Sequence, residues 1–355
     1  MNERRNKMAE MMKAYVFEKE DVAVLKDIPK WECGDDDVLI KVKACGICHS
    51  DYELLEGKYI VPFTYPCVPG HEWSGQVVEV GKNVDNFVVG DRVVGECVIG
   101  CGQCEVCQEG HSEFCPTADH FGFTFGLNGA QSEYVICKPG WLHKLKDNVD
   151  YRTGSLIEPF SVSYNGIQGI GGVNAGDTVV VIGGGTIGLC ACAAAKAMGA
   201  GVINIEPLAY RREIAKKLNV DYVIDPTEED AVAKVRELTN GYGADLVVEC
   251  SGSIPGLASS FSYARNGGRV SHVGIRIGEM ASLDLGIIQQ HGLTVKGFVG
   301  SPNCWQKVID FLDRTKLDLS PIQTQEFKFE DVDEAYKFAR NIKENELVKV
   351  CVVQE

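Results

Sequence analysis

The chain lacks any hydrophobic run approaching the ~20 residues that a membrane-spanning helix needs. We find no secretory signal peptide, internal repeat or low-complexity segment. Basic residues are in deficit, with 35 Lys and Arg against 50 Asp and Glu, for a formal net charge of −15. Nucleic acids and anionic membranes attract basic surfaces. We therefore expect a cytoplasmic protein that binds neither.

The chain is rich in cysteine, with 15 among 355 residues. A secreted disulfide scaffold would be short and rich in loops. Here Cys190, Cys192 and Cys250 lie in apolar segments, where a free thiol behaves as a small hydrophobic group. A reducing cytosol fits this pattern. The length and the 45% hydrophobic content suit about two domains with complete cores.

The pattern of residues divides the chain into three parts. The opening MNERRNKMAEMMK is expected to be a loose polar extension. From Met12 to about Pro159, short β-branched runs between Gly, Pro and Asp predict an all-β, barrel-like unit. From about Ser161 to Phe298, strands alternate with helices, which predicts a parallel doubly wound sheet. Helices around Trp305–Asp313 and Val332–Ile342 then precede a strand, LVKVCVV, that can return to the first unit.

Four cysteines, in the segment CGQCEVCQEGHSEFC, have the spacing of a metal site. Four thiolates can surround one tetrahedral Zn²⁺ and leave no position open for water. Disulfides are the alternative, and a cytosolic setting argues against them. We expect a structural zinc site formed by Cys101, Cys104, Cys107 and Cys115.

A glycine-rich segment, VVVIGGGTIGL, predicts a dinucleotide site because it follows a buried strand and precedes a helix. Gly183 permits a tight turn, Gly185 lets a pyrophosphate approach the backbone, and Gly188 lets helix and strand pack closely. The helix N-terminus supplies N–H donors. We expect Thr186 and Ile187 to contribute contacts as well. A glycine turn in an ordinary α/β sheet is the alternative.

The identity of the dinucleotide depends on Glu206, which ends the next strand. A carboxylate there accepts hydrogen bonds from the ribose hydroxyls and repels a 2′-phosphate, so NAD is favoured over NADP. Arg211 and Arg212 lie nearby, and an arginine can accommodate a 2′-phosphate. We include Arg211 among the expected cofactor contacts.

A second constellation of metal-binding residue types lies in ACGICHSD, PGHEWSG and LIEPFSV. One thiolate (Cys48), one imidazole (His71) and one or two carboxylates (Glu72, Glu158) can hold Zn²⁺ with a position open for substrate, as catalysis requires. Cys45 and Cys48 also form a C-x-x-C redox pattern. We disfavour that interpretation because thioredoxin-like sites follow a βαβ pattern, which is absent here.

Together, CGICHSD, GHEWSGQVVEVG, CGQCEVCQEGHSEFC and VIGGGTIGL resemble the zinc-dependent medium-chain alcohol dehydrogenases, and EPFSV resembles their polyol branch (sorbitol, threonine and butanediol dehydrogenases). The resemblance covers nearly the whole chain. It implies an α/β protein with a GroES-like β-barrel catalytic domain (1–160), a Rossmann domain (161–298) and a C-terminal return to the catalytic domain (299–355). It also implies two zinc ions per chain, NAD, and a homodimer or homotetramer built through the Rossmann sheet edge.

The resemblance assigns roles to individual residues. It makes Cys48 and His71 ligands of the catalytic zinc, with Glu72 and Glu158 as alternative or exchanging carboxylates. Asp51 is then the carboxylate that fixes the imidazole. By the same resemblance, the hydroxyl of Ser50 hydrogen-bonds the substrate oxygen and passes its proton outward. His49 contacts a cofactor phosphate. Zinc would lower the pKa of the substrate alcohol, and hydride would pass to the nicotinamide.

Two positions depart from the pattern. Glu53 occupies the position where many relatives have a histidine that completes the proton path. Gly300 and Ser301 replace the Arg-Tyr pair of sorbitol dehydrogenases, which makes sorbitol itself a doubtful substrate. Three further residues are candidates for the substrate pocket or for plain packing: His120, Phe121 and Phe123.

The sequence therefore predicts an oxidoreductase acting on a small secondary alcohol such as a polyol, vicinal diol or cyclitol. A non-catalytic redox sensor that binds zinc and nucleotide is the alternative from another class. A zinc-free quinone reductase on the same fold is disfavoured by Cys48, His71 and the four-cysteine segment.

Overall fold

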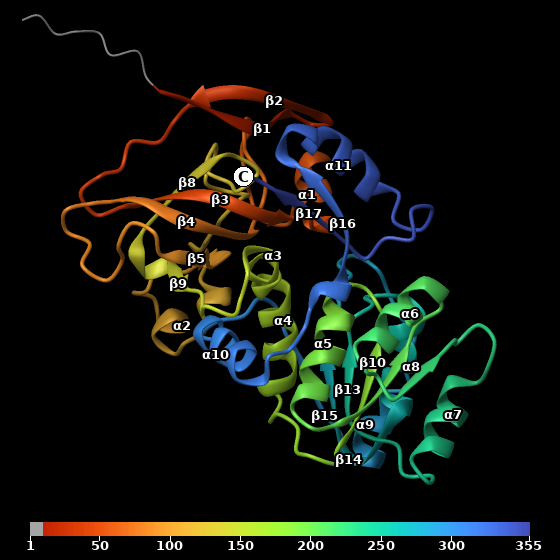
Figure 1. Cartoon of the computed structure of the whole chain (residues 1–355). Helices are drawn as coiled ribbons and strands as arrows, with labels where there is room; N and C mark the ends of the chain where they lie inside the picture. The colour runs from red at the N-terminus through yellow and green to blue at the C-terminus, as the bar shows by residue number, and fades with distance from the viewer. Residues whose placement is uncertain (1–9) are drawn as a thin grey trace, which may run out of the picture.

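The computed structural model describes residues 10–355, and the first nine residues of the expected extension lie outside them. Two units lie one above the other in Figure 1, and helix α4 runs down beside α5 of the lower unit, with α10 on its other side. The upper unit contains most of the chain before α3 and also the C-terminal strands. The lower unit contains the parallel sheet. The bounds of the helices are α1 (His49–Leu55), α2 (Glu105–Gln108), α3 (Tyr151–Ser155), α4 (Ile157–Gln168), α5 (Thr186–Ala197), α6 (Ala209–Lys217), α7 (Ala231–Leu238), α8 (Ile254–Tyr263), α9 (Gly286–His291), α10 (Trp305–Thr315) and α11 (Val332–Arg340).

The first unit contains a mixed sheet in the order β16-β17-β3-β4-β5-β9, with β8 paired beside β3. A separate antiparallel ribbon, β1-β2, lies along its top in Figure 1. The bounds are β1 (Met11–Lys19), β2 (Val22–Pro29), β3 (Val38–Gly46), β4 (Glu72–Val80), β5 (Arg92–Gly95), β8 (Tyr134–Cys137), β9 (Leu142–Lys144), β16 (Gln323–Lys328) and β17 (Lys349–Val353). The short strands β6 (Val98–Ile99) and β7 (Asp119–His120) pair with each other.

Within residues 10–355 the sheet of this barrel-like unit is open between β16 and β9. One expectation for this unit needs correction. The polar extension does not reach Lys13, because β1 begins at Met11 and Met12 is 1% exposed. The apolar face of this strand is buried against Ile28 and Val68, which outweighs the polar character of its neighbours.

The C-terminal strand does return to the first unit. Antiparallel pairing places Cys351 opposite Gly46 and Val353 opposite Ala44, on the central strand β3. The strand β17 has four buried residues in five, so its return completes a face of the core that the earlier strands leave open. This pairing also carries Lys349 toward the loop between β3 and α1.

The second unit is a six-stranded parallel sheet in the order β12-β11-β10-β13-β14-β15. Its strands are β10 (Thr178–Ile182), β11 (Gly201–Ile205), β12 (Tyr222–Ile224), β13 (Ala244–Glu249), β14 (Ala264–His272) and β15 (Thr294–Gly297). The central strands β10 and β13 are almost wholly buried because helices cover both faces, which is why they are continuous apolar runs. The predicted doubly wound sheet is confirmed.

Helix α4 joins the two units. It begins at Ile157, before the expected boundary at residue 160, and packs along α5 of the second unit. The small residues of α5, such as Ala191 and Ala194, let the two helices approach closely. The first turn of α4 therefore lies where the two units meet. No helix within the described part of the chain is long and apolar enough to cross a membrane.

Candidate active site

Three of the expected metal ligands lie together. One ligand atom each from Cys48, His71 and Glu72 falls within 4.8 Å of the other two. Cys48 is the residue that caps α1, and Glu72 begins β4 directly after His71. The loop after β3 and the start of β4 meet because β3 and β4 pair antiparallel, with Gly46 opposite Glu72. Thiolate, imidazole and carboxylate form a donor set that suits Zn²⁺.

Asp51 connects the helix cap to the imidazole. One of its oxygens, Oδ2, accepts the backbone N–H of Cys48 at 3.0 Å. The other, Oδ1, lies 3.6 Å from Nδ1 of His71. Both of these atoms are buried and have no other hydrogen-bond partner. A small shift would join them and leave Nε2 of the imidazole free for a metal, as the role expected of Asp51 requires.

The surroundings raise the pKa of His71. Burial alone would lower it, but the nearby Cys97 and Cys48 thiols and the Asp51 carboxylate outweigh burial and hold the pKa well above its ordinary value. A cluster of thiol and carboxyl groups around one imidazole fits a cation at the site.

Glu72 has a partner that the sequence did not reveal. The ammonium of Lys349, on β17, donates to both carboxylate oxygens at 2.8 and 2.6 Å, and to the carbonyl of Ile47 at 3.0 Å. Lys349 is 4% exposed and Glu72 is 1% exposed. The one signal for this pair was a lysine inside the otherwise apolar strand LVKVCVV. The C-terminal strand thus contributes a charge to the metal cluster.

Glu158 lies in the first turn of α4 and is not among the three residues whose ligand atoms meet within 4.8 Å. It is half-buried. Burial raises the pKa of its carboxyl to about 7, with the charge of Glu72 acting in the same direction and that of His71 opposing it. The buried thiol of Cys97 lines the same crevice as Glu158. No sequence signal set Cys97 apart from an ordinary core cysteine.

An aromatic wall borders His71. The ring of Phe123 lies 4.6 Å from the imidazole, and Tyr59 stacks on Phe123 at 4.2 Å. The hydroxyl of Tyr59 lies 2.9 Å from Nδ1 of His120. Phe121 instead packs in the core against Trp73, with 1% of its surface exposed. Of the three pocket candidates, Phe123 contacts His71 and His120 contacts Tyr59 in the same wall, whereas Phe121 packs in the core. Tyr59 was missed.

The proposed relay residues occupy α1. His49 and Ser50 form its first turn, with His49 exposed and Ser50 half-buried. Glu53 lies one turn further on and is half-buried. Ser50 lies two residues after the cap residue Cys48, one of the three residues of the metal cluster.

The glycine segment forms the tight turn between β10 and α5. Gly183 has a φ of +97°, which glycine adopts without strain. A Cβ at Gly188 would lie 2.0 Å from the carbonyl oxygen of Gly183, so no side chain fits there. Gly185 caps α5, and a Cβ there would lie 3.7 Å from Nη1 of Arg211. Thr186 and Ile187 begin the helix, where their backbone N–H groups are free of helical partners.

Glu206 lies against this turn. Its carboxylate accepts the N–H groups of Gly184 and Leu208. Arg211 approaches it at 3.9 Å. Arg212 is engaged elsewhere, in a 2.7 Å ion pair with Asp225. The carboxylate is thus fixed at the end of β11, beside the loop that a dinucleotide would occupy.

The four lobe cysteines also meet, with their sulfur atoms within 4.8 Å of one another. Backbone N–H groups donate to Sγ of Cys101 and Cys115. The backbone N–H of Cys101 is the main reason that the pKa of Cys115 falls to about 6, which favours the thiolate that binds metal. All 15 cysteines lie in the described residues and none forms a disulfide. The donor set fits a closed zinc site.

Comparison with known proteins identifies the fold and the family. Residues 34–147 match the alcohol dehydrogenase GroES-like domain, and residues 186–314 match the zinc-binding dehydrogenase domain. The chain is 34% identical over 348 residues to sorbitol dehydrogenase of Bacillus subtilis, covering 96% of this chain and 97% of that protein. It is 35% identical over 328 residues to L-threonine 3-dehydrogenase of Pyrococcus furiosus, covering 91% and 92%.

Solved structures agree. A putative zinc-binding dehydrogenase from Sinorhizobium meliloti, bound to NADP, superposes with a TM-score of 0.90 at 30% identity, covering 97% of this chain and all of that one. The 2R,3R-butanediol dehydrogenase of Bacillus subtilis gives 0.86, also at 30% identity, with coverage of 97% and 100%.

These matches define an oxidoreductase with a zinc-binding, GroES-like unit and a nicotinamide-binding Rossmann unit. The chain belongs to the zinc-dependent medium-chain alcohol dehydrogenases, in their polyol branch. The predicted family, fold class and enzyme class are confirmed. The relatives are named as dehydrogenases, which favours the enzyme over a redox sensor.

Proposed function

We propose that this enzyme uses NAD to oxidise a secondary alcohol of a polyol, vicinal diol or cyclitol to the ketone. The observation that carries the proposal is the meeting of Cys48, His71 and Glu72 within 4.8 Å beside the first turn of α4, where the two units join. A three-residue donor set of this kind leaves a metal position open for substrate.

Two zinc ions per chain are proposed. Cys48 and His71 would hold the catalytic ion together with Glu72 or Glu158, and the lobe cysteines Cys101, Cys104, Cys107 and Cys115 would hold the structural ion. When bound, the catalytic ion supplies a Lewis acid that lowers the pKa of the substrate hydroxyl. Lys349 holds both carboxylate oxygens of Glu72 at the edge of the cluster, while Glu158 lies in the first turn of α4.

The chain's own residues then orient the reactants. Asp51 holds the imidazole of His71 through Nδ1. Ser50 hydrogen-bonds the substrate oxygen and receives its proton, which passes to solvent directly or through Glu53. Phe123 and Tyr59 exclude water from one side of the imidazole.

NAD is the proposed cofactor. Gly183, Gly185, Thr186, Ile187 and Gly188 would contact its pyrophosphate. Three side chains complete this proposed cofactor site: His49 at a phosphate, Glu206 at the ribose hydroxyls and Arg211 beside the loop. The fixed carboxylate of Glu206 supports NAD because it would repel a 2′-phosphate.

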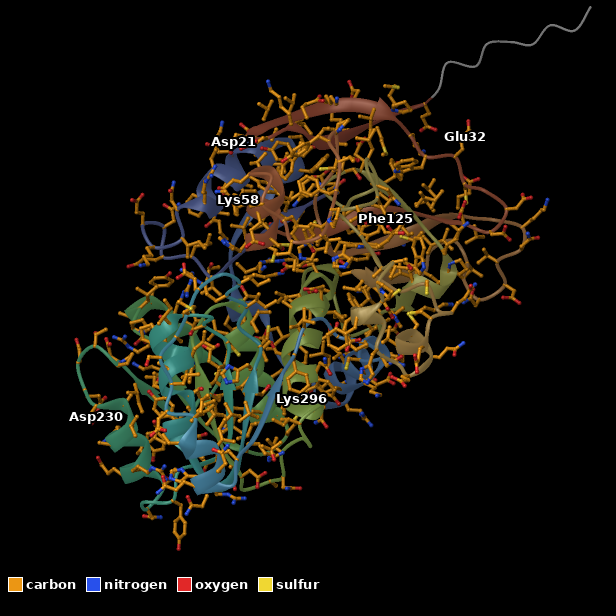
Figure 2. All side chains as sticks on the ribbon, turned by 180° about the vertical axis from the view of Figure 1, so that it is seen from behind. Asp21, Glu32, Lys58, Phe125, Asp230 and Lys296 are labelled. Carbon is orange, nitrogen blue, oxygen red and sulfur yellow. The ribbon has the colours of Figure 1, made fainter. Side chains whose placement is uncertain are left out.

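We further propose a cytoplasmic homodimer or homotetramer. Strand β15 is an unpaired sheet edge with all four residues exposed, and Figure 2 labels Lys296 on it. Apolar side chains nearby are exposed as well, among them Ile277, Met280 and Val299. A second copy pairing edge to edge would cover both features. The proposed domains are the catalytic unit (1–160 with 299–355) and the Rossmann unit (161–298).

A substrate screen tests this function. Polyols, vicinal diols and cyclitols are offered to the zinc-loaded enzyme with NAD and, separately, with NADP, while absorbance of the reduced nicotinamide is followed. Turnover with NAD on at least one of these alcohols, together with about two zinc ions per chain by metal analysis, is expected. One zinc and no turnover on the whole panel would refute the proposal.

A further inference from the structure

A narrow crevice shares Glu158 with the candidate metal site. Its volume is about 10 Å³, enough for one group the size of a water molecule. Segments far apart in the sequence form its walls: the end of β5, the cysteine lobe, α4 and the start of α10. The residues that matter here are Glu96, Cys97, Glu113, Glu158, Ser301 and Trp305.

The crevice is strongly anionic. Three of its lining residues are glutamates, and none is lysine or arginine. His143 donates to or accepts from Glu96 at 2.8 Å, and His111 lies 3.4 Å from Glu113 on the exposed side of the lobe. Within the described residues, neither Glu96 nor Glu113 pairs with a lysine or arginine, so these two carboxylates have no permanently charged partner.

Glu113 has an unsatisfied oxygen. Its side chain is only 8% exposed, and Oε1 faces His111. The second oxygen, Oε2, is buried and has no hydrogen-bond partner. Leaving a buried acceptor unpaired costs about 1–3 kcal/mol, and more for a charged one. This oxygen therefore lacks a hydrogen-bond donor within the described residues, and a bound ligand can supply one.

The neighbouring residues keep the crevice open. Gly300 has a φ of +63°, and a Cβ there would lie 3.4 Å from Cβ of Glu113. Ser301 is small, and its hydroxyl lies 2.6 Å from that of Ser161. Trp305, which stacks on His143, supplies an aromatic ring to the same walls.

Building on the proposed function, we propose that this crevice binds an ammonium group of the substrate, so that the enzyme prefers amino alcohols or amino polyols to neutral polyols. An ammonium has the size of water and offers three donors, which suit Glu113 and Glu96. An indole ring also attracts a cation. A substrate phosphate or carboxylate would be repelled by the same carboxylates.

Matched substrate pairs test the proposal. Glucosaminitol is compared with sorbitol, and aminocyclohexanols with cyclohexanediols, so that an ammonium replaces one hydroxyl. Charged hydrogen bonds are worth about 1.5–3 kcal/mol, so the amino member should have a kcat/KM about 10- to 150-fold higher. Calorimetry of the same pairs with the NADH complex gives a binding readout independent of turnover, and the same order of affinity is expected.

Substitutions of the crevice glutamates test whether the preference for the amino compounds arises in the crevice. Glu113→Gln removes the charge with little change of shape, and should lower the amino-to-neutral ratio of kcat/KM at least tenfold. Glu96→Gln is the second variant, in case the first loses lobe zinc by metal analysis. Glu109→Gln, an exposed glutamate on the same lobe, is the control and should leave the ratio unchanged.

The outcomes distinguish failure of the ammonium proposal from failure of the proposed dehydrogenase function. Equal kcat/KM for both members of each pair, with no change in Glu113→Gln, means that the crevice holds water only, and the ammonium proposal is wrong while the dehydrogenase function stands. Absence of turnover on every alcohol refutes the proposed function. Calorimetry then still tests whether the crevice binds an ammonium group. Weaker or equal binding of the amino compounds, compared with the neutral ones, overturns the ammonium proposal.

Discussion

Lys349 and Glu72 form a buried ion pair in which one ammonium serves both carboxylate oxygens, at 2.8 and 2.6 Å. Burial alone would lower the pKa of Lys349, but the charge of Glu72 outweighs it and raises the pKa above the ordinary value. The ammonium of Lys349 therefore stays charged at neutral pH. The pair ties the last strand of the chain to the residue that follows His71.

Lys349→Met should destabilise the enzyme strongly. Removing one partner leaves the Glu72 charge buried and unpaired, which costs about 3–5 kcal/mol. Urea unfolding followed by circular dichroism measures the loss. The control is Lys337→Met, which breaks an exposed pair with Asp333 and should cost no more than about 1 kcal/mol.

A double variant tests whether the unpaired carboxylate of Glu72 causes the loss of stability. Adding Glu72→Gln to Lys349→Met removes the stranded charge, so part of the lost stability should return. If Lys349→Met unfolds at the same urea concentration as the unaltered protein, the ion pair contributes nothing to stability.

Cys48→Ala should remove the catalytic zinc and abolish turnover. Metal analysis is expected to fall from about two zinc ions per chain to about one, because a site with one fewer ligand binds zinc weakly. NADH binding, followed by its fluorescence, should remain because the glycine turn lies on the other unit. Cys33→Ala is the control, since that thiol donates to the carbonyls of Gly34 and Asp37 and belongs to neither metal cluster in the described residues. Near-normal rates in Cys48→Ala would disprove the metal assignment.

Cys115→Ser should empty the cysteine lobe. Its thiolate is stabilised by the backbone N–H of Cys101, and a serine hydroxyl is a poor substitute as a zinc ligand. We expect the loss of about one zinc per chain and a lower melting temperature by calorimetry, because structural zinc contributes directly to folding. An unchanged zinc content would mean that the lobe holds no metal.

Local sequence patterns were sufficient to predict much of the fold and of the candidate site. The parallel sheet followed from apolar runs alternating with helices, and the cysteine lobe and glycine turn from spacing alone. Cys48, His71 and Glu72 were found because each belongs to a short motif. The strand ladder of the first unit was harder, since whether a sheet closes depends on pairings between distant segments such as β9 and β16.

Residues that reach the site only through tertiary contacts could not be identified from the sequence. Lys349 stands 277 residues from Glu72 and lies beside it only because β17 pairs with β3. Tyr59 and Cys97 carry no motif, and their roles depend on which side of a loop they face. Phe121 and Phe123 are two residues apart, yet one enters the core and the other faces His71.

Cofactor choice should respond to Glu206. Its carboxylate is fixed by the N–H groups of Gly184 and Leu208 and would repel a 2′-phosphate. Glu206→Gln keeps one acceptor oxygen and removes the charge, so the ratio of kcat/KM for NADP over NAD should rise about tenfold or more, equivalent to ~1.4 kcal/mol. Steady-state kinetics with both cofactors measures it. Glu213→Gln, which alters an exposed glutamate on α6, should leave the ratio unchanged. An unchanged ratio in Glu206→Gln would remove this residue from cofactor selection.

Gly188→Ala should weaken both the fold and dinucleotide binding. The added methyl group would lie 2.0 Å from the carbonyl oxygen of Gly183, which is backbone and cannot rotate away, so α5 must move off β10. Overpacking of this kind costs about 1–3 kcal/mol, and the shift displaces the helix N-terminus that would face the pyrophosphate. Urea unfolding and NADH titration measure the two effects. Gly140→Ala is the matched control, because a methyl group there meets no atom within 4 Å. Unchanged NADH affinity in Gly188→Ala would show that close packing of helix and strand is not needed to bind the cofactor.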